Sequence, residues 1–189
     1  MSKKYVLIDA SPRKGGNSEV IVDLLAKELS DFEVTVFKIN EKSWNPCQAC
    51  NYCMEKGEVC CRQNDDLAKL LPKLEEADGI ILTGPIYFGS ISGQAKSIID
   101  RFYAFFDPTV NGMSKSKKHG KKAAMLFCCG SGPADKYKEQ LNYLVNGFAV
   151  SGASEMKTEI FGGLLAVGAI KQKPEYLDKI KEIAGWLKA

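Results

Sequence analysis

The sequence Tyr5-Val-Leu-Ile-Asp-Ala-Ser-Pro-Arg-Lys-Gly-Gly-Asn-Ser18 joins a short apolar run to a polar loop that contains two glycines. An apolar run of this length suits a strand that is buried on both faces of a parallel sheet. From Asn17 to Leu29, apolar residues recur at helical spacing. The segment therefore predicts a buried strand, a loop and a helix, which together form the first unit of an α/β protein.

Strand and helix patterns alternate along the rest of the chain. Further strands are predicted over residues 33–39, 79–83, 122–128 and 157–161. Further helices are predicted over residues 67–74, 92–105, 137–148 and 174–187, with Asp65 or Asp66 as the N-cap of the first of these. The series predicts a three-layer, doubly wound α/β fold whose parallel five-stranded sheet has the order 2-1-3-4-5. A ligand is then expected at the carboxyl ends of the first and third strands.

No repeat, low-complexity tract or linker divides the chain, so we expect residues 1–189 to form a single domain. Two segments interrupt the alternation of strands and helices: a cysteine-rich insertion at about residues 43–64, and residues 107–120. Both are longer than ordinary connections, which favours functional loops.

Composition excludes several classes of function. The chain is 45% hydrophobic and 26% charged, with a formal net charge of +3. This charge is too small to indicate a nucleic-acid partner, and we interpret the lysine-rich residues 115–122 as a solvated loop. The sequence has no apolar run long enough to cross a bilayer and no signal-peptide pattern at its N-terminus, so we expect no membrane association and a cytoplasmic location.

The polar loop has the features of a phosphate site. It lies between a buried strand and a helix, where backbone N–H groups and the helix dipole favour an anion. Hydroxyl, amide and guanidinium donors are available from Ser11, Arg13, Asn17 and Ser18. The loop matches neither the dinucleotide fingerprint G-x-G-x-x-G nor the Walker pattern, which disfavours both of those sites. The alternative is a polar turn in which Asn17 caps the helix.

Two further loops are candidates to hold a flat ring. A flavin needs backbone donors and acceptors at one edge and aromatic or aliphatic surface on its faces. After the third strand, both are offered by Pro85, Ile86, Tyr87, Phe88 and Gly89. After the fourth strand, Gly130 and Ser131 are expected to close the other side of the ring. The alternative is that Tyr87 and Phe88 are core or interface residues.

The cysteines suggest a metal centre. The run Cys47-x2-Cys50-x2-Cys53, followed by Cys60 and Cys61, has a spacing similar to that of [4Fe–4S] ligands. Zinc sites more often use two separated pairs. A cluster, free thiols and zinc all remain open, and the length of the loop favours Cys60 as the fourth ligand. We interpret Cys128 and Cys129, at the end of a strand, as small core residues.

No residue is predicted to act as a catalytic acid or base. His119 is the only histidine and lies in a lysine-rich loop, so we place it on the surface and exclude a histidine-based triad. We expect Arg101 to form a structural ion pair or to lie in an interface. The chemistry is therefore assigned to a cofactor.

Five motifs occur in order along the chain: Ser11-Pro-Arg-Lys-Gly-Gly-Asn-Ser18, Pro46-Cys-x-x-Cys-x-x-Cys53, Asp65-Asp66, Gly84-Pro-Ile-Tyr-Phe-Gly89 and Lys96-x-x-x-Asp100-Arg101. Together they resemble the NAD(P)H-dependent FMN reductase family, and within it the branch called iron–sulfur flavoproteins. The resemblance covers nearly the whole chain. It implies a flavodoxin-like fold, bound FMN, electron transfer, and a homodimer or homotetramer.

The resemblance also implies roles for particular residues. The family's phosphate loop matches Ser11, Arg13, Asn17 and Ser18, and its ring loop matches residues 85–89. The possible [4Fe–4S] cluster would take Cys47, Cys50, Cys53 and either Cys61 or Cys60 as ligands. By analogy with relatives, the distance to Asp65-Asp66 favours Cys61.

We therefore expect an FMN-dependent oxidoreductase that is reduced by NAD(P)H or by a ferredoxin-type donor. FMN is expected rather than FAD because there is one mononucleotide-type loop and no second glycine-rich fingerprint. The alternatives are an electron carrier that docks protein partners, and a cofactor-free binding module with a zinc-stapled loop. A homo-oligomer is expected because four aromatic residues are candidates for exposure: Tyr87, Phe88, Tyr103 and Phe106.

Overall fold

The computed structural model describes residues 2–111 and 113–189. Its central sheet has parallel strands β1 (Lys4–Asp9), β2 (Glu33–Lys38), β3 (Gly79–Tyr87), β5 (Lys121–Cys128) and β6 (Ala153–Phe161). The spatial order is β2-β1-β3-β5-β6. When only the parallel strands are counted, this is the order 2-1-3-4-5, so the predicted topology is confirmed.

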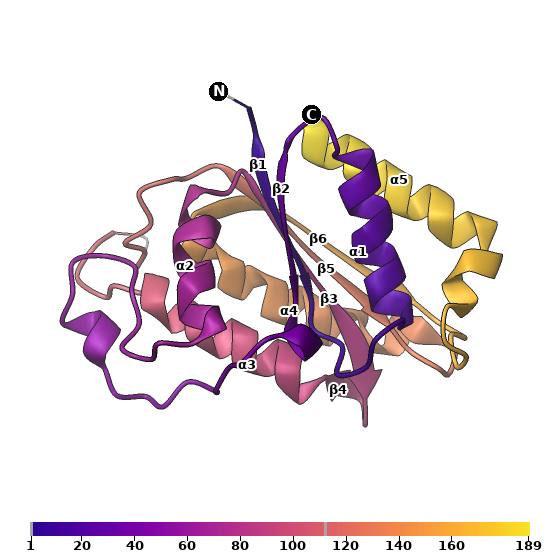
Figure 1. The fold of residues 1–189 in the computed structure, drawn as a ribbon, viewed down its shortest axis with the longest axis horizontal. Helices are drawn as coiled ribbons and strands as arrows, with labels where there is room; N and C mark the ends of the chain where they lie inside the picture. Colours follow the sequence, from indigo (N-terminus) through magenta and orange to yellow (C-terminus); the bar gives the residue numbers. More distant parts are fainter. Residues whose placement is uncertain (1, 112) are drawn as a thin grey trace.

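Helices cover both faces of the sheet, as Figure 1 shows. One face is covered by α1 (Asn17–Glu28) and α5 (Pro174–Lys188), and the other by α2 (Asp66–Glu76), α3 (Gly93–Arg101) and α4 (Lys138–Val145). The fold is the expected flavodoxin-like α/β fold. Among the described residues, no helix is long and apolar enough to span a membrane.

Strand β1 is apolar from Tyr5 to Ile8 because both of its faces are buried. Tyr5 and Leu7 pack in the core beneath α1 and α5, whereas Val6 and Ile8 pack in the core on the opposite face. Successive side chains of a strand point to opposite faces, and here both faces are covered. The strand is therefore apolar without alternation, and its carboxyl end carries the polar loop to the edge of the sheet.

The third strand is longer than predicted. Residues 84–87, which were expected to form a loop, continue β3, and Gly84 and Pro85 pair with β5. A short strand β4 (Ser90–Ile91) then folds back against β3. The two-residue turn between them has positive φ at Phe88 (47°) and Gly89 (82°), as a type I′ hairpin requires. Pairing with β5 overrides the turn-like Gly-Pro composition.

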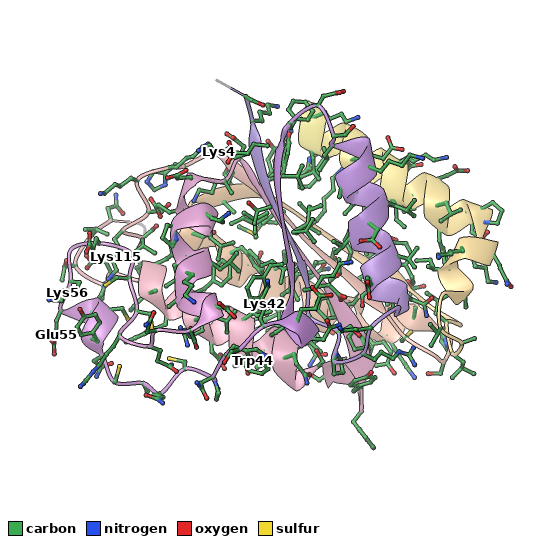
Figure 2. All side chains as sticks on the ribbon, in the orientation of Figure 1. Lys4, Lys42, Trp44, Glu55, Lys56 and Lys115 are labelled. Atoms are coloured by element: carbon green, nitrogen blue, oxygen red, sulfur yellow. The ribbon has the colours of Figure 1, made fainter. Side chains whose placement is uncertain are left out.

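The two insertions lie beside each other beyond α2 (Figure 1). Residues 43–64 contain a single 3₁₀ turn at Tyr52–Met54, and the described part of residues 107–120 contains no helix. The ammonium of Lys115 donates to the carbonyls of Cys53 and, at 3.2 Å, of Lys56. Figure 2 shows Lys115 and Lys56 close together at this end of the molecule. The second insertion thus holds the tip of the first.

The base of the cysteine-rich insertion is held by a buried ion pair. Arg101 Nη2 lies 2.8 Å from Asp65 Oδ1, and Nη1 donates to Asp65 Oδ2 and to the Asn45 carbonyl, each at 3.1 Å. Asp65 is also the N-cap of α2, accepting from the Ala68 amide at 2.8 Å. Arg101 is therefore a structural ion-pair residue, which was one of the two roles expected for it.

Candidate cofactor site

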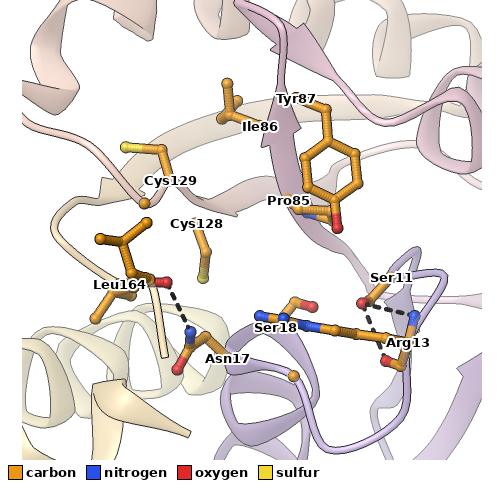
Figure 3. A pocket seen from close by; sticks show the side chains of 13 residues that line it. Ser11, Arg13, Asn17, Ser18, Pro85, Ile86, Tyr87, Cys128, Cys129 and Leu164 are labelled. Atoms are coloured by element: carbon orange, nitrogen blue, oxygen red, sulfur yellow. Dashed lines mark hydrogen bonds between the residues drawn. The ribbon is translucent and has the colours of Figure 1, made fainter. Parts of the chain in front are cut away.

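A cavity of about 280 Å³ opens at the carboxyl edge of the sheet, where β1 and β3 end. Its volume is close to the lower end of the range for ligand pockets. Figure 3 shows that its walls come from the loop after β1, the ends of β3 and β5, and the segment after β6. It is lined by Ser11, Arg13, Gly16, Asn17, Ser18, Pro85, Ile86, Tyr87, Cys128, Cys129, Gly130, Leu164 and Leu165.

The structure brings most of the predicted site residues together here. The four residues of the expected phosphate loop line the cavity, as do Pro85, Ile86, Tyr87 and Gly130. Three other predicted residues do not line it: Phe88, Gly89 and Ser131. Phe88 and Gly89 form the hairpin turn, and the carbonyl of Ser131 accepts from Cys129 Sγ at 3.0 Å. Phe88 is fully exposed.

The loop after β1 is shaped by its own hydrogen bonds. Ser11 Oγ donates to the Arg13 carbonyl at 3.1 Å and accepts from the Arg13 amide at 3.3 Å. Gly15 has φ +69°, a conformation that glycine adopts without strain. A Cβ on Gly16 would lie 3.3 Å from Ser11 Oγ. This tight turn leaves the Arg13 guanidinium at the cavity (Figure 3).

Asn17 lines the cavity, but its side chain serves another purpose. Its amide nitrogen donates to the carbonyls of Leu164 (3.2 Å) and Ala166 (3.0 Å). Its oxygen accepts from the Ile170 amide at 3.0 Å. Both amide hydrogens are used, so the side chain fastens the segment after β6 to α1. The N-cap of α1 is Gly16, so the alternative in which Asn17 caps the helix is wrong.

The remaining donors suit an anion. The first N–H groups of α1 have no partners inside the helix, and the helix dipole places partial positive charge at this end. Ser18 and Arg13 line the cavity, and they offer a hydroxyl and a planar cation. A phosphate group matches this combination of donors.

The sequence pattern did not single out Asp9, which lies directly beneath the loop. Asp9 is fully buried, and its Oδ1 accepts from the Ser11 amide at 3.0 Å. Among the described residues, its Oδ2 has no hydrogen-bond partner. Burial raises the pKa of Asp9 to about 6, and the Ser18 hydroxyl and the Ser11 amide oppose this rise. An acid at the end of an otherwise apolar strand was the available signal.

Cys128 and Cys129 are buried, as predicted, and both also line the cavity. Burial raises the pKa of each thiol, and the charge of Asp9 raises that of Cys128 further. Both are therefore neutral thiols at physiological pH.

The sequence analysis did not predict Leu164 and Leu165 as cavity residues. Their position after the last strand, at the same edge of the sheet, was the signal that could have indicated them.

The cysteine-rich insertion has the donors for a metal centre but not the geometry. All its thiols are free, and among the described residues no group of three or more Cys, His, Asp or Glu side chains could hold a metal ion. Burial raises the pKa of Cys53, and the nearby thiols of Cys61 and Cys47 raise it further. Burial also raises the pKa of Cys60, where the next contribution comes from Glu58. Among the thiols that follow Cys53 in the insertion, it is that of Cys61 which affects the pKa of Cys53.

The family model described as NADPH-dependent FMN reductase matches residues 4–162. The chain belongs to this family. The matched span contains the loop after β1, the β3–β4 hairpin and the cysteine-rich insertion, and it ends just before Leu164. The family resemblance noted in the sequence is therefore confirmed.

Relatives of similar sequence are named iron-sulfur flavoproteins. One from Archaeoglobus fulgidus is 34% identical over 150 residues, which are 78% of this chain and 64% of that protein. One from Methanosarcina thermophila is 39% identical over 101 residues, which are 52% of this chain and 51% of that protein. The matches thus span about half to under two thirds of the relatives' own lengths.

Solved structures of low sequence identity share the fold. An NAD(P)H:quinone oxidoreductase from Methanothermobacter marburgensis superposes with a TM-score of 0.74 at 16% identity, covering 100% of this chain and 98% of that one. An FMN-dependent NADH-azoreductase from Bacillus anthracis, solved in complex with FMN, has a TM-score of 0.70 at 16% identity and covers 99% of this chain and 100% of that one.

Proposed function

We propose that the protein is an FMN-dependent oxidoreductase that binds the FMN phosphate on the loop from Ser11 to Ser18. The observation that carries this proposal is the cavity at the β1/β3 edge, where Arg13, Ser18 and the first turn of α1 face one volume. Membership of the FMN reductase family supports it, as does the shared fold of an azoreductase solved with FMN.

The flavin ring is assigned to the other wall of the cavity. Pro85, Ile86 and Tyr87 offer backbone groups and an apolar surface, and Gly130 lets the chain approach closely from β5. Bound FMN supplies the electron-accepting chemistry. The residues of this chain bind the phosphate, position the ring and limit the access of water. We assign no acid or base role to any of them.

The flavin itself is the first test. The protein is purified, the flavin is released by denaturation, and its mass is measured. FMN is the expected result. FAD would contradict the assignment of a mononucleotide site, and a colourless protein that binds no added flavin would favour the cofactor-free alternative.

The electron donor is the second test. We propose NAD(P)H as donor because the family is described as NADPH-dependent and because two proteins that share the fold are named for NAD(P)H and NADH. The flavin absorbance should bleach within seconds when NADPH or NADH is added without oxygen. If the flavin bleaches only with reduced ferredoxin, the protein is an electron carrier for protein partners instead.

The cysteine-rich insertion is proposed to hold iron as a [4Fe–4S] cluster on Cys47, Cys50, Cys53 and Cys61. The names of the relatives and the thiol donor set support this proposal. Because the thiols are not gathered for metal binding, the loop must rearrange to bind iron. Iron and sulfide are measured after anaerobic reconstitution of the wild type and of two matched variants. Cys61→Ser should lose iron and Cys60→Ser should keep it; the reverse would make Cys60 the ligand.

A homo-oligomer is also proposed. Tyr87, Phe88 and Tyr103 are exposed, as expected, whereas Phe106 is half-buried and stacks on Tyr103 with ring centroids 5.7 Å apart. Tyr87 lines the cavity and Phe88 follows it in the hairpin turn. A second copy of the chain that covered these two rings would also cover the flavin. Light scattering at micromolar concentration should show a dimer or tetramer, and a monomer would contradict the proposal.

A further inference from the structure

Asp9 is a buried acid with half of its hydrogen-bonding capacity unused. Its side chain is fully buried at the end of β1, and its Oδ2 has no partner among the described residues. An ionised carboxylate in this state is costly, because water no longer solvates the second oxygen. A purely structural role would be served better by a neutral side chain. The acid therefore calls for a functional explanation.

The surrounding charges do not neutralise Asp9. Three charged or titratable groups interact with Asp9: Glu19 of α1, Lys38 of β2 and Cys128 of β5. Arg13 of the loop interacts with Cys128. Lys38 is the positive neighbour, but its ammonium already pairs with Glu19 at 2.9 Å and Asp23 at 3.0 Å. The hydroxyl of Thr83 on β3 donates to the Ile8 carbonyl at 3.1 Å, so it does not donate to the Asp9 carboxylate.

Ser18 links the buried acid to the cavity. Ser18 lines the cavity, and its hydroxyl lowers the pKa of the Asp9 carboxyl group. The same carboxyl group accepts, through Oδ1, from the amide of Ser11 at 3.0 Å, and Ser11 also lines the cavity. A hydroxyl has one hydrogen to donate. An ionised Asp9 attracts this hydrogen inward and leaves an oxygen lone pair facing the cavity. A protonated Asp9 leaves the hydrogen free to point at a bound anion.

We propose that Asp9 couples FMN binding to a proton: the phosphate binds tightly when Asp9 is protonated and more weakly when Asp9 is ionised. This inference rests on the proposed FMN site. Two effects act in the same direction, because an ionised Asp9 both repels the phosphate and turns the Ser18 hydroxyl away from it. By linkage, binding of the phosphate must in turn favour protonation of Asp9.

The direction of the pH dependence follows. In the free protein, the pKa of Asp9 is about 6, and a bound phosphate raises it further. Between these two values the complex holds a proton that the free protein has lost, so the affinity for FMN falls as the pH rises. The phosphate of FMN itself ionises near pH 6, and its dianion binds a cationic loop more tightly. That effect has the opposite sign and is shared by any variant of Asp9.

The test compares the wild type with Asp9→Asn, which has the shape of the protonated acid and cannot ionise. FMN affinity is measured by quenching of flavin fluorescence from pH 5.5 to 8.5, with riboflavin as the matched ligand that lacks the phosphate. We expect similar FMN affinities at pH 5.5 and about ten-fold tighter binding by the Asn variant at pH 8. Riboflavin affinity should differ little between the two proteins.

A second measurement covers the case in which the Asn variant does not fold. Calorimetry of the wild type at pH 7, in two buffers of different ionisation enthalpy, counts the protons taken up with each ligand. Proton uptake with FMN but not with riboflavin supports the proposal. Equal uptake with both ligands, or the same FMN profile for wild type and Asn variant, overturns it. If neither protein binds FMN at any pH, it is the proposed function that fails, and this inference fails with it.

Discussion

The loop after β1 and the cysteine-rich insertion are both irregular segments that follow a strand of the same sheet, yet they are built differently. The β1 loop is held by its own side chains: Ser11 bonds to Arg13, and Asn17 fastens the loop to the segment after β6. The insertion is held from outside, by Arg101 at its base and Lys115 at its tip. Two of its cysteines, Cys53 and Cys61, are partly buried against the core.

The comparison shows how the two sites depend on their ligands. The β1 loop presents its donors to a cavity because local hydrogen bonds fix its backbone. The insertion brings thiols near one another without a ligating arrangement, so a metal would complete its order. The first site is preorganised by the fold, and the second depends on two anchors.

The largest effect is expected at the base of the insertion. Arg101→Ala leaves the carboxylate of Asp65 buried without its partner, and this should lower the free energy of unfolding by about 3–5 kcal/mol. Urea denaturation measures the change. The matched control is Lys96→Ala on the same helix, which removes an exposed pair with Asp100 and should change stability by less than about 1 kcal/mol. Equal effects of the two variants would show that the anchor has no special role.

The next effect concerns the acid beneath the β1 loop. Burial raises the pKa of Asp9 from 3.8 to about 6, so the folded protein holds a proton that the unfolded chain releases. Stability should therefore fall as the pH rises from about 4 to 6, by up to about 3 kcal/mol. Asp9→Asn should remove this fall, leaving the flavin-free variant more stable than the wild type at pH 8. Thermal melts across this pH range decide the point, and parallel curves for the two proteins would contradict it.

An effect of similar or smaller size is expected on FMN affinity. Arg13→Ala removes a charge-assisted contact to the phosphate, which should weaken FMN binding about ten- to a hundred-fold, or about 1.5–3 kcal/mol. Lys14→Ala is the matched control, because Lys14 is the adjacent cation and does not line the cavity. Titration with FMN distinguishes them. If both variants bind FMN as the wild type does, the loop is not the phosphate site.

The smallest effect is expected at the tip of the insertion. Lys115→Gln weakens the link to the Cys53 and Lys56 carbonyls, and this should favour local opening by about 1 kcal/mol. Limited proteolysis should then cut within residues 54–63 several times faster, with little change in the melting temperature. Lys117→Gln, at an exposed lysine two residues away, should leave the rate of cutting unchanged. Equal rates for all three proteins would mean that the tip is held by other contacts.

Part of the candidate site could be predicted from the sequence because its residues are consecutive in the chain. A buried strand followed by a Ser-, Arg- and Gly-containing loop and a helix fixes where an anion can bind. The roles inside the loop were less predictable. The amide of Asn17 was expected to reach a ligand, but it bonds to Leu164 and Ala166, which lie nearly 150 residues further along the chain. No local pattern encodes a partner at that distance.

The sequence by itself determined the order of the strands, the edge of the sheet where the cavity lies and the family, because periodicity, turn composition and motif order are local properties of the chain. Only the tertiary structure decided that Gly84 and Pro85 belong to a strand, that Asp9 is a buried acid and that Asn17 bonds to the segment after β6. Each of these depends on which distant segments pack together. Burial and pairing are set by those neighbours, and a residue's own sequence context does not specify them.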